Sequence, residues 1–448
     1  METVYLVIAL FALVTVFGLW SRTVRRFGYT VYVLLRALLK TRLDRFHGRV
    51  DSAPARLREA FESLGPTYVK LAQLVASSEG MFPDAYCLEF QKCLDRVPSF
   101  SVNQVRQTVR EEFGREPEEI FQELEDRPLA SASIAQVHCA VLRDGTPVVL
   151  KVQRPKLPRV VQADLRVLRM LARIMERLPQ GDMASPVGVV EDFANNLAEE
   201  LDFRNEAKNL DQFNGIMTQH AFTTVAAPKP HHELSSPRAL VMERFYGVRI
   251  DDRAGLTHYA DAEIEDKLIS GLRAWFRCLL VHGFFHGDVH AGNLMVLTDG
   301  RIGFLDFGIV GRFEGTRQQL VSDFLLSTAM RDFKKLGRTM LEMSGAKDAD
   351  EAALTADLEA QVAPLLDPSK PAKYADMIPA ITRAGLRYRV AMPRDFVLIL
   401  KQMIYFDRYA KLLAPKLNIF ADPRIIKNLM EDLMLAQAAR ARSKTQAA

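Results

Sequence analysis

The feature that most constrains this chain is a pair of acidic motifs joined by a predicted hairpin. The first motif, His-Gly-Asp-Val-His-Ala-Gly-Asn, spans 286–293, and the second, Asp-Phe-Gly, spans 306–308. Two β-rich runs with Asp-Gly between them fill 294–305, which is a strong hairpin signal. Because a hairpin brings its two ends together, Asn293 and Asp306 are expected to lie close to each other.

These side chains have the chemistry of a site for phosphoryl transfer. Phosphate oxygens need a divalent cation to neutralise them, and hard oxygen ligands such as Asn293 and Asp306 hold Mg²⁺. Asp288 would orient or deprotonate the attacking hydroxyl or water. The order acid, asparagine, hairpin and Asp-Phe-Gly is the layout of a kinase catalytic loop. Asp-Phe-Gly alone is often only a turn, so the signal depends on the spacing and the strand context.

The first motif also contains a histidine pair. His286 and His290 stand four positions apart, which raises the question of a metal site. They flank the acid of a loop with Gly287 between them, and they do not share a regular helix. We therefore favour hydrogen bonds that brace the loop, and a metal site is the alternative.

A second hairpin places one lysine in an apolar strand. The runs 137–143 and 147–153 are β-rich and are separated by Asp-Gly-Thr. Lys151 has apolar neighbours on both sides, and burying it without a partner would cost several kcal/mol. It therefore needs a carboxylate or a phosphate, unless it is an edge lysine that faces solvent. A kinase has such a lysine on the strand after its nucleotide loop, paired with a helix glutamate.

The expected partner lies in an acidic segment at 200–206. If 187–217 is one helix, Asp202 and Glu206 share a face, and Glu200 points about 120° away from Glu206. One helix would then offer carboxylates in two directions. A solvated acidic face is the alternative.

The segment before the lysine strand lacks the glycines of a phosphate loop and is instead rich in alanine and serine. Small residues let backbone N–H groups approach phosphates, but alanine and serine resist the positive φ angles that glycine adopts. This loop should therefore be stiffer than a glycine flap. The residues expected to contact a nucleotide are Ala130, Ser131, Ala132, Ser133, Lys151, Met242 and Glu243.

The N-terminus carries a candidate membrane anchor. Every residue of Val4–Trp20 is apolar or small, at the short end for a transmembrane helix. Asp44 is the only acid in the basic stretch 21–50, so the positive-inside rule places the chain after Trp20 in the cytoplasm. Residues 31–40 suit an interfacial amphipathic helix. The alternative is a hydrophobic helix docked on the protein's own surface.

Composition sets broader limits. A chain of 448 residues can form two or three domains with sizeable cores. A net charge of +4 gives no reason to expect nucleic acid as a partner. Four scattered cysteines without CxxC spacing are typical of reduced, partly buried thiols. Helical patterns cover 55–79 with a break near Gly65-Pro66, 102–125 with a break around Gly114–Pro117, 261–282 and everything after 315.

Taken together, these motifs resemble the UbiB/ADCK/AarF family of atypical kinases. The likeness rests on the alanine-serine loop, on Glu-Leu-Asp-Phe at 200–203 and on the motif at 286–293. The segment Gly-Pro-Thr-Tyr-Val-Lys-Leu-Ala-Gln at 65–73 is similar to the family's Lys-x-Gly-Gln signature. The motifs occur in family order over about four-fifths of the chain.

The resemblance implies an α+β, protein-kinase-like two-lobed fold with a β-rich N-lobe, a helical C-lobe and an N-terminal helical extension, to which the apolar run Val4–Trp20 adds one expected transmembrane helix. The signature helix would fold over the active site, Lys70 would pair with Glu200, and Glu206 would pair with Lys151. The implied roles are catalytic for Asp288, Lys151 and Glu206, metal-binding for Asn293 and Asp306, and regulatory for Lys70, Gln73, Glu200 and Asp202. The implied divisions are 1–22 (anchor), 23–54 (basic segment), 55–126 (signature extension), 127–245 (N-lobe), 246–436 (C-lobe) and 437–448 (flexible tail).

The family is associated with ATPase activity and with support of ubiquinone or other isoprenoid-lipid metabolism. ATP and Mg²⁺ are therefore the expected cofactors, and membrane lipids, isoprenoid or quinone intermediates and quinone-biosynthesis enzymes are the expected partners. Formation of a homodimer is a further alternative. The expected location is the inner or plasma membrane with a cytoplasmic catalytic body. The alternatives are a nucleotide-gated scaffold with little turnover and a conventional protein kinase.

Some positions depart from the family pattern. Ala72 stands where the signature has glycine, and we expect the fold to survive this added methyl group. The usual Ser-Thr-Arg-x-Asp segment is replaced by Ser77–Met81, which loses a basic residue and an acid. Val289 and Ala291 stand where prolines are usual, and the anchor lies at the N-terminus, whereas bacterial relatives carry C-terminal membrane helices.

Overall fold

The chain forms two compact units in the computed structural model. Unit 1 comprises Met1–Phe203 and Ser236–Leu240, and unit 2 comprises Arg204–Ser235 and Val241–Ala448. The structure describes residues 22–49, 51–76, 82–93, 98–177, 185–346, 348–366, 376–390, 394–419 and 422–447.

Two predictions lie outside these described residues, the apolar run Val4–Trp20 and the replaced segment Ser77–Met81. Among the helices that are described, none has the length and apolar character needed to cross a membrane.

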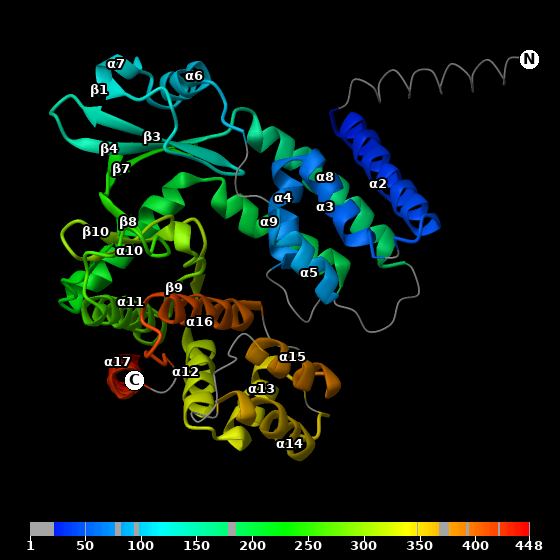
Figure 1. Ribbon diagram of the computed structural model, residues 1–448, viewed down its shortest axis with the longest axis vertical. Helices are drawn as coiled ribbons and strands as arrows, with labels where there is room; N and C mark the ends of the chain where they lie inside the picture. The colour runs from blue at the N-terminus through cyan, green and yellow to red at the C-terminus, as the bar shows by residue number, and fades with distance from the viewer. Residues whose placement is uncertain are drawn as a thin grey trace, which may run out of the picture. The chain divides into compact units, whose positions relative to one another are not determined.

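Unit 1 contains helices before and after the strands at 121–153. They are α2 (Arg22–Phe46), α3 (Ala53–Leu64), α4 (Pro66–Ala76), α5 (Asp84–Phe90), α6 (Val102–Phe113), α7 (Pro117–Ile120), α8 (Leu157–Met175) and α9 (Pro186–Glu200). The predicted break at Gly65-Pro66 is confirmed, because Gly65 ends α3 with a φ of 95° and proline starts α4. In Figure 1, α2 runs alongside α3 and α8.

An antiparallel sheet forms the rest of unit 1. Its strands are β1 (Phe121–Leu124), β2 (Ala130–Ser131), β3 (Ala135–Leu142), β4 (Pro147–Gln153) and the start of β7 (Ala239–Glu243). The order is β1-β3-β4, with β2 also paired to β3. The predicted β3–β4 hairpin is confirmed, and Gly145 adopts the positive φ of 88° that its turn requires. The predicted break around Gly114–Pro117 is confirmed, since α6 ends before Gly114 and α7 begins at Pro117, but the helical prediction is wrong at its end, where β1 pairs with β3.

Unit 2 combines short strands with helices. Its strands beyond β7 are β5 (Val225–Ala226), β6 (Pro230–Ser235), β8 (Gly247–Arg249), β9 (Phe284–His286), β10 (Leu294–Leu297), β11 (Ile302–Phe304) and β12 (Val310–Arg312). One sheet has the order β5-β11-β10-β8, and β12 pairs with β9. The predicted hairpin across Asp299-Gly300 is confirmed as β10–β11.

The helices of unit 2 follow the sequence pattern closely. They are α10 (Phe203–Gln219), of which Phe203 belongs to unit 1, α11 (Asp261–His282), α12 (Gly315–Ala329), α13 (Phe333–Ser344), α14 (Glu351–Val362), α15 (Met377–Arg387), α16 (Arg394–Leu413) and α17 (Pro423–Ala447). Two short 3-10 turns, Ala291–Asn293 and Ala363–Leu366, complete the elements. The end of the chain, predicted as a flexible tail from 437, continues α17 as far as Ala447.

The predicted single helix over 187–217 is wrong. The structure has two helices, since α9 ends at Glu200 and α10 begins at Phe203. Asp202 lies between them and is not helical. Asp202 and Glu206 therefore do not share a helix face.

All four cysteines are buried thiols outside any disulfide. Cys87, Cys93 and Cys139 belong to unit 1, and Cys278 lies on α11 in unit 2. Burial raises the pKa of the Cys278 thiol well above its ordinary value.

The predicted lobe boundaries stay predictions, because the two compact units divide the chain in a different way from the lobes of a kinase.

Candidate functional site

The loop at 286–293 is fixed at its start by His286. This side chain is buried, its Nε2 lies 2.8 Å from the Leu305 carbonyl oxygen, and its Nδ1 accepts the Asp288 backbone N–H at 3.1 Å. Burial lowers the pKa of His286, so the ring is neutral and Nε2 carries the proton. Both ring nitrogens are therefore used within the loop, which supports the bracing interpretation over a metal pair.

Helix α16 holds the centre of the same loop. The side-chain oxygen of Gln402 accepts the Val289 N–H at 2.8 Å, and the Tyr409 hydroxyl donates to the Val289 carbonyl at 2.9 Å. Gln402 is fully buried. These bonds satisfy both backbone groups of a buried residue, so α16 fixes the loop immediately after Asp288.

Asn293 closes the loop through its side-chain amide. Its side-chain amide donates to the Asp288 carbonyl at 2.9 Å, which leaves Oδ1 as an acceptor. The Asp288 carboxylate is about one-quarter exposed, and its Oδ2 lies 3.6 Å from Nε2 of His290. The Nδ1 of His290 accepts the Gly292 N–H at 2.9 Å. Asp288 is thus accessible at a position that the backbone holds rigidly.

The Asp-Phe-Gly turn has an unusual backbone. Asp306 has a φ of 51°, a left-handed conformation that costs energy for a residue with a Cβ. Its Oδ1 accepts the Gly308 N–H at 3.2 Å. Phe307 is fully buried, and its carbonyl accepts a bond from the Asn209 amide at 2.8 Å. The side chains and backbone around it therefore fix where the Asp306 carboxylate lies.

Helix α10 provides that support from one face. Asn209 is held in turn by Arg312, whose Nη2 donates to its Oδ1 at 2.6 Å. One turn further on, Phe213 packs its ring 5.0 Å from that of Phe307. Glu206 precedes Asn209 by three residues on the same helix and is 3% exposed. The helix that carries Glu206 is therefore tied directly to the Asp-Phe-Gly turn.

The residues around this turn suit Mg²⁺ with few protein ligands. The described residues contain no group of three or more His, Cys, Asp or Glu side chains that could hold a metal ion. Asn293 and Asp306 offer hard oxygens, and Mg²⁺ bound to a nucleotide takes one or two protein ligands together with phosphate and water. These two residues thus fit the expected ion, whereas a metal cage built by the protein alone is not found among the described residues.

In unit 1, Lys151 lies in a buried strand as predicted. It is 6% exposed, and its Nζ lies 5.4 Å from the centre of the Phe203 ring. Its neighbour on the strand, Gln153, donates to the Leu201 carbonyl at 2.8 Å. The solvent-facing alternative for Lys151 is therefore wrong. Glu206 belongs to unit 2, and its pairing with Lys151 stays a prediction.

The alanine-serine loop is held by an arginine that the sequence did not single out. The Arg154 guanidinium donates to the Ala132 carbonyl from Nε at 3.0 Å and from Nη2 at 2.8 Å, and to the Ser131 hydroxyl at 3.0 Å. Its Nη1 donates to the Pro98 carbonyl at 2.9 Å. The loop is therefore clamped by a side chain, and its stiffness relative to a glycine flap stays a prediction.

The other loop residues differ in exposure. Ala130 and Ala132 are exposed, while Ser133 is buried. Met242 is buried, and the Glu243 N–H donates to the Lys229 carbonyl at 2.9 Å. Their contact with a nucleotide stays a prediction.

The predicted ion pair of the signature helix is present. Lys70 on α4 contacts Glu200, the last residue of α9, and both side chains are mostly buried. Ala72 on the opposite side of α4 is fully buried and packs with Val75 and Phe90. The methyl group that replaces glycine therefore lies inside a packed core. Gln73 is partly buried on the same helix.

Comparisons with known proteins show which family the chain belongs to. Residues 92–340 match the model of the ABC1 atypical kinase-like domain. The chain belongs to this family. It is 37% identical over 83% of its length to an uncharacterized chloroplastic aarF domain-containing protein kinase of Arabidopsis thaliana, covering 74% of that protein. It is 40% identical over 82% of its length to an uncharacterized protein of Mycobacterium tuberculosis, covering 76% of it.

Similarity extends to proteins named UbiB. The chain is 31% identical over 82% of its length to a probable protein kinase UbiB of Cellvibrio japonicus, covering 67% of that protein. The family model and these relatives confirm the predicted family and a kinase-like domain of mixed α and β content. Among solved structures, the chain is similar to that of Rv3197 in complex with erythromycin from Mycobacterium tuberculosis, with 23% identity, a TM-score of 0.49, and coverage of 78% of this chain and 92% of that one.

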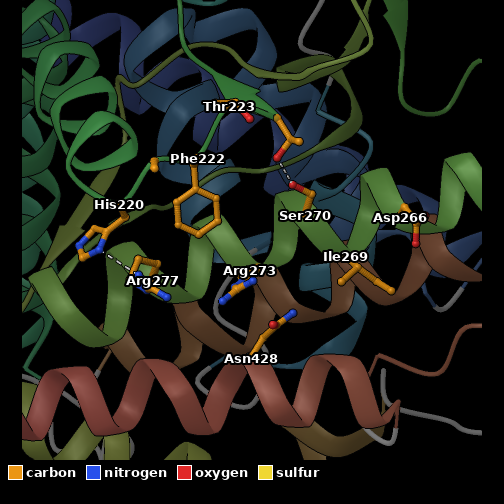
Figure 2. A pocket seen from close by; sticks show the side chains of 11 residues that line it. His220, Phe222, Thr223, Asp266, Ile269, Ser270, Arg273, Arg277 and Asn428 are labelled. Atoms are coloured by element: carbon orange, nitrogen blue, oxygen red, sulfur yellow. Dashed lines mark hydrogen bonds between the residues drawn. The ribbon is translucent and has the colours of Figure 1, made fainter.

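One feature of this kinase-like chain has no counterpart in the sequence predictions. A cavity of about 350 Å³ lies in unit 2, lined by residues of α11, α17 and the segment 220–224 (Figure 2). None of the predicted site residues lines it. Its polar side chains come from helices whose local sequence is ordinary, so only the fold brings them together.

Proposed function

We propose that this chain is an ATP- and Mg²⁺-dependent atypical kinase or ATPase that acts at a membrane surface in ubiquinone or other isoprenoid-lipid metabolism. The observation that carries the proposal is the braced loop, in which Asp288 stays accessible while His286, Gln402 and Tyr409 fix the backbone on both sides of it. Such rigidity suits catalysis by positioning, which dominates phosphoryl transfer.

Each residue has a role in this proposal. Asn293 and Asp306 hold the cation, which neutralises phosphate oxygens when it is bound. Lys151 contacts nucleotide phosphates, and Asp288 orients the acceptor hydroxyl or water and takes its proton. The left-handed backbone of Asp306 supports a functional role, because strain of this kind collects where a side chain must be aimed.

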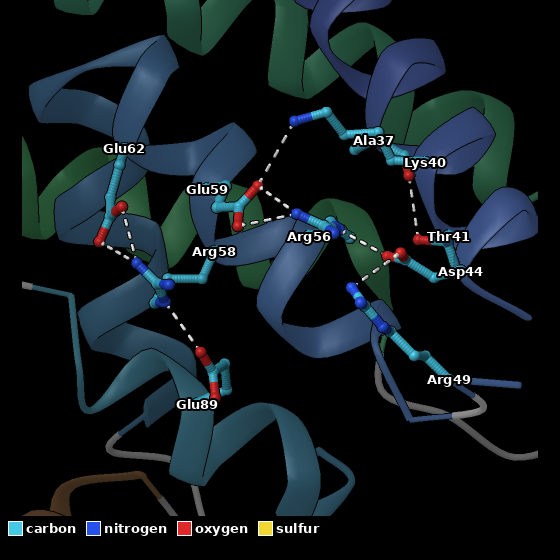
Figure 3. A network of polar contacts seen from close by, with 10 residues as sticks. All are labelled: Ala37, Lys40, Thr41, Asp44, Arg49, Arg56, Arg58, Glu59, Glu62 and Glu89. Atoms are coloured by element: carbon cyan, nitrogen blue, oxygen red, sulfur yellow. Dashed lines mark hydrogen bonds and ion pairs between the residues drawn. The ribbon is translucent and has the colours of Figure 1, made fainter. Parts of the chain in front are cut away.

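The outer face of α2 supports the membrane part of the proposal. Its inner face packs on α3 and α8 of unit 1, where Arg26 pairs with the buried Asp164. An ion-pair network also joins Asp44 of α2 to Arg56 and Glu59 of α3 (Figure 3). The opposite face carries an exposed apolar stripe at helical spacing, formed by Tyr32, Leu35, Leu39, Leu43 and Phe46.

Basic residues border this stripe. Arg36, Arg42 and Arg45 are exposed and form no ion pair with any other described residue. An apolar stripe with arginines on its flanks suits an interface with anionic lipid, where the side chains enter the headgroup region and the arginines meet phosphates. The position of α2 directly after the apolar run Val4–Trp20 agrees with this placement.

The test is ADP release by the full-length protein with Mg²⁺ and anionic liposomes. We expect turnover by the native protein, and a loss of about two orders of magnitude or more in Asp306→Asn, because the cation loses a charged ligand. Asp348→Asn, which changes an exposed acid elsewhere in unit 2, serves as the matched control. Equal ADP release by the native protein and Asp306→Asn would disprove a catalytic role.

The Lys70–Glu200 pair favours a second candidate function. In the family this chain resembles, the signature helix occupies the region where a substrate would bind, and here that helix is fixed by an ion pair. A nucleotide-gated scaffold would bind ATP and release no ADP. A rise in melting temperature with ATP and Mg²⁺ that is lost in Lys151→Ala, without turnover, would select the scaffold.

A further inference from the structure

The cavity in unit 2 is lined by hydrogen-bond donors from three elements. Ser270 and Arg273 lie on α11, Asn428 lies on α17, and Thr223 belongs to the segment between α10 and β5. Figure 2 shows these side chains around one hollow, with the Phe222 ring beside the guanidinium groups. The Phe222 ring centre lies 5.8 Å from the guanidinium carbon of Arg273.

Several of these donors lack an acceptor within the described part of the chain. The Nε of Arg273 is buried and has no hydrogen-bond partner there. Its Nη2 donates to Glu431 at 2.7 Å, a partly exposed pair of modest strength. The Thr223 hydroxyl on an exposed residue and the Asn428 amide on a half-buried one form no bond to another described residue. Because buried donors are nearly always satisfied in folded proteins, the buried Nε of Arg273 points to an acceptor that comes from outside, and Thr223 and Asn428 lie free to bind the same acceptor.

The second arginine of the cavity is already fully engaged. Arg277 is 6% exposed, its Nε donates to Asp432 at 2.5 Å, and its Nη1 donates to Nδ1 of His220 at 2.9 Å. Arg277 is therefore fixed in an ion pair at the cavity wall, while Arg273 is the group that can bind a ligand. Asp266 is the carboxylate that lines the cavity, and it is 76% exposed at the rim.

We propose that this cavity binds a small molecule through a phosphate group, held by Arg273, Asn428 and Thr223. A tetrahedral oxyanion presents acceptors in several directions, which suits donors that converge from three elements. Phe222 and Ile269 provide an apolar wall for the organic part of the ligand. The site lies outside the residues assigned to catalysis, and its occupant is a phosphate ester rather than the nucleotide of the proposed function.

Binding in this cavity would affect the catalytic loop. The Thr224 carbonyl accepts the N–H of Ile302, the first residue of β11, and β11 leads to Asp306. On α11, the Trp275 indole donates to the His286 carbonyl at 3.0 Å. Two of the elements that line the cavity therefore contact the strand that leads to Asp306 and the start of the loop that carries Asp288, so we expect the ligand to be regulatory.

The test is isothermal titration of the full-length protein with glycerol 3-phosphate, and in a second arm with phosphatidic acid in phosphatidylcholine vesicles. The first arm detects a free phosphate ester, and the second detects a lipid headgroup. We expect Arg273→Gln and Asn428→Leu each to weaken binding by about tenfold or more. Arg387→Gln, which breaks an exposed ion pair elsewhere in unit 2, should leave the affinity unchanged.

Two results would overturn the proposal: no binding in either arm, or binding that Arg273→Gln and Asn428→Leu both leave intact. Asn428 has no polar contact to lose among the described residues, so its variant decides the matter if Arg273→Gln does not fold. Lys151→Ala should keep this affinity while losing nucleotide binding, which separates failure of this site from failure of the proposed function.

Discussion

A single guanidinium sets the shape of the alanine-serine loop. Arg154 stacks over the Phe100 ring at 5.7 Å and fixes the carbonyl oxygens of Pro98 and Ala132. Its planar fork makes bonds in several directions, which a lysine at this position could not reproduce. Arg154 is thus a positioning residue for the loop rather than a group that contacts a nucleotide.

We expect Arg154→Lys to loosen the loop without unfolding unit 1. Loss of these bonds should cost about 1–2 kcal/mol of stability and raise KM for ATP more than it lowers kcat. Hydrogen exchange at 129–135 would report the loosening directly, with Arg127→Lys, an exposed neighbour, as the control. Unchanged exchange in Arg154→Lys would contradict a positioning role.

Gln402 plays the corresponding part for the catalytic loop. Gln402→Leu keeps the volume but leaves the Val289 N–H buried without an acceptor, so we expect a loss of about 2–3 kcal/mol in the free energy of unfolding. The loop should also lose its fixed geometry, and ADP release should fall. Urea denaturation and the ADP assay measure these effects. The control is Gln361→Leu, which changes a partly exposed glutamine on α14. An equal loss of stability in both variants would argue against a role of Gln402 in holding the catalytic loop.

At the scale of elements, the sequence predicted what strong local patterns determine. The helix at 261–282, the strand around Lys151 and both hairpins have clear periodicity or Asp-Gly turns, and the structure has them where expected. Strand β1 was missed because its four residues show no alternation of buried and exposed positions; its pairing with β3 makes it a strand.

The same limit applies to the supports of the candidate site. Arg154, Asn209 and Gln402 were missed because their roles depend on contacts between distant parts of the chain. The break between Glu200 and Phe203 was missed because helix propensity continues through it. Motif residues could be found from their spacing, whereas the side chains that hold them could not.

The Lys70–Glu200 pair joins α4 to α9, so its energy belongs to the packing of these two helices. Both side chains are mostly buried, at 16% and 14% exposure, so removing one partner leaves a charge in a poorly solvated place. In a double-mutant cycle with Lys70→Met and Glu200→Gln, we expect a coupling energy of about 1–3 kcal/mol.

Denaturant unfolding of the four proteins measures that coupling. The exposed pair Arg110–Glu116 of unit 1 is a suitable comparison and should give a coupling well under 1 kcal/mol, about the usual value for surface pairs. If the two cycles give the same coupling, the signature helix is not held by its lysine.

At the scale of the whole molecule, a chain of hydrogen-bonded charged and polar groups makes the stability of unit 2 depend on pH. Asp432 on α17 accepts from Arg277 on α11, Arg277 donates to His220, which follows α10, and His220 lies 2.8 Å from Nε2 of His282. Because arginine only donates, His220 must accept at Nδ1 and donate from Nε2, which makes His282 a neutral acceptor. Burial lowers the pKa of His282 to about 4.

This arrangement predicts acid destabilisation. A histidine whose pKa is lower in the folded than in the unfolded state favours folding above pH 6.5, and that contribution is lost as pH falls toward 4. Burial raises the pKa of Asp432 to about 6, and this group acts in the opposite sense, since its contribution is lost as pH rises through 6.

We therefore expect His282→Gln, which keeps the acceptor but cannot gain a proton, to lose less stability than the native protein between pH 7 and pH 4.5. Urea midpoints across this range measure the difference. His258→Gln, a change at an exposed histidine of the same unit, should follow the native curve. Identical pH profiles for the native protein and His282→Gln would rule out this chain of hydrogen bonds.

The buried cysteines can be used to measure local opening of each unit. Each compact unit holds at least one buried thiol, Cys139 on strand β3 of unit 1 and Cys278 on α11 of unit 2. An alkylating reagent reaches such a sulfur only when the surrounding structure opens. Timed alkylation followed by mass spectrometry would therefore record, without any engineered label, which unit a bound nucleotide, lipid or phosphate ester tightens.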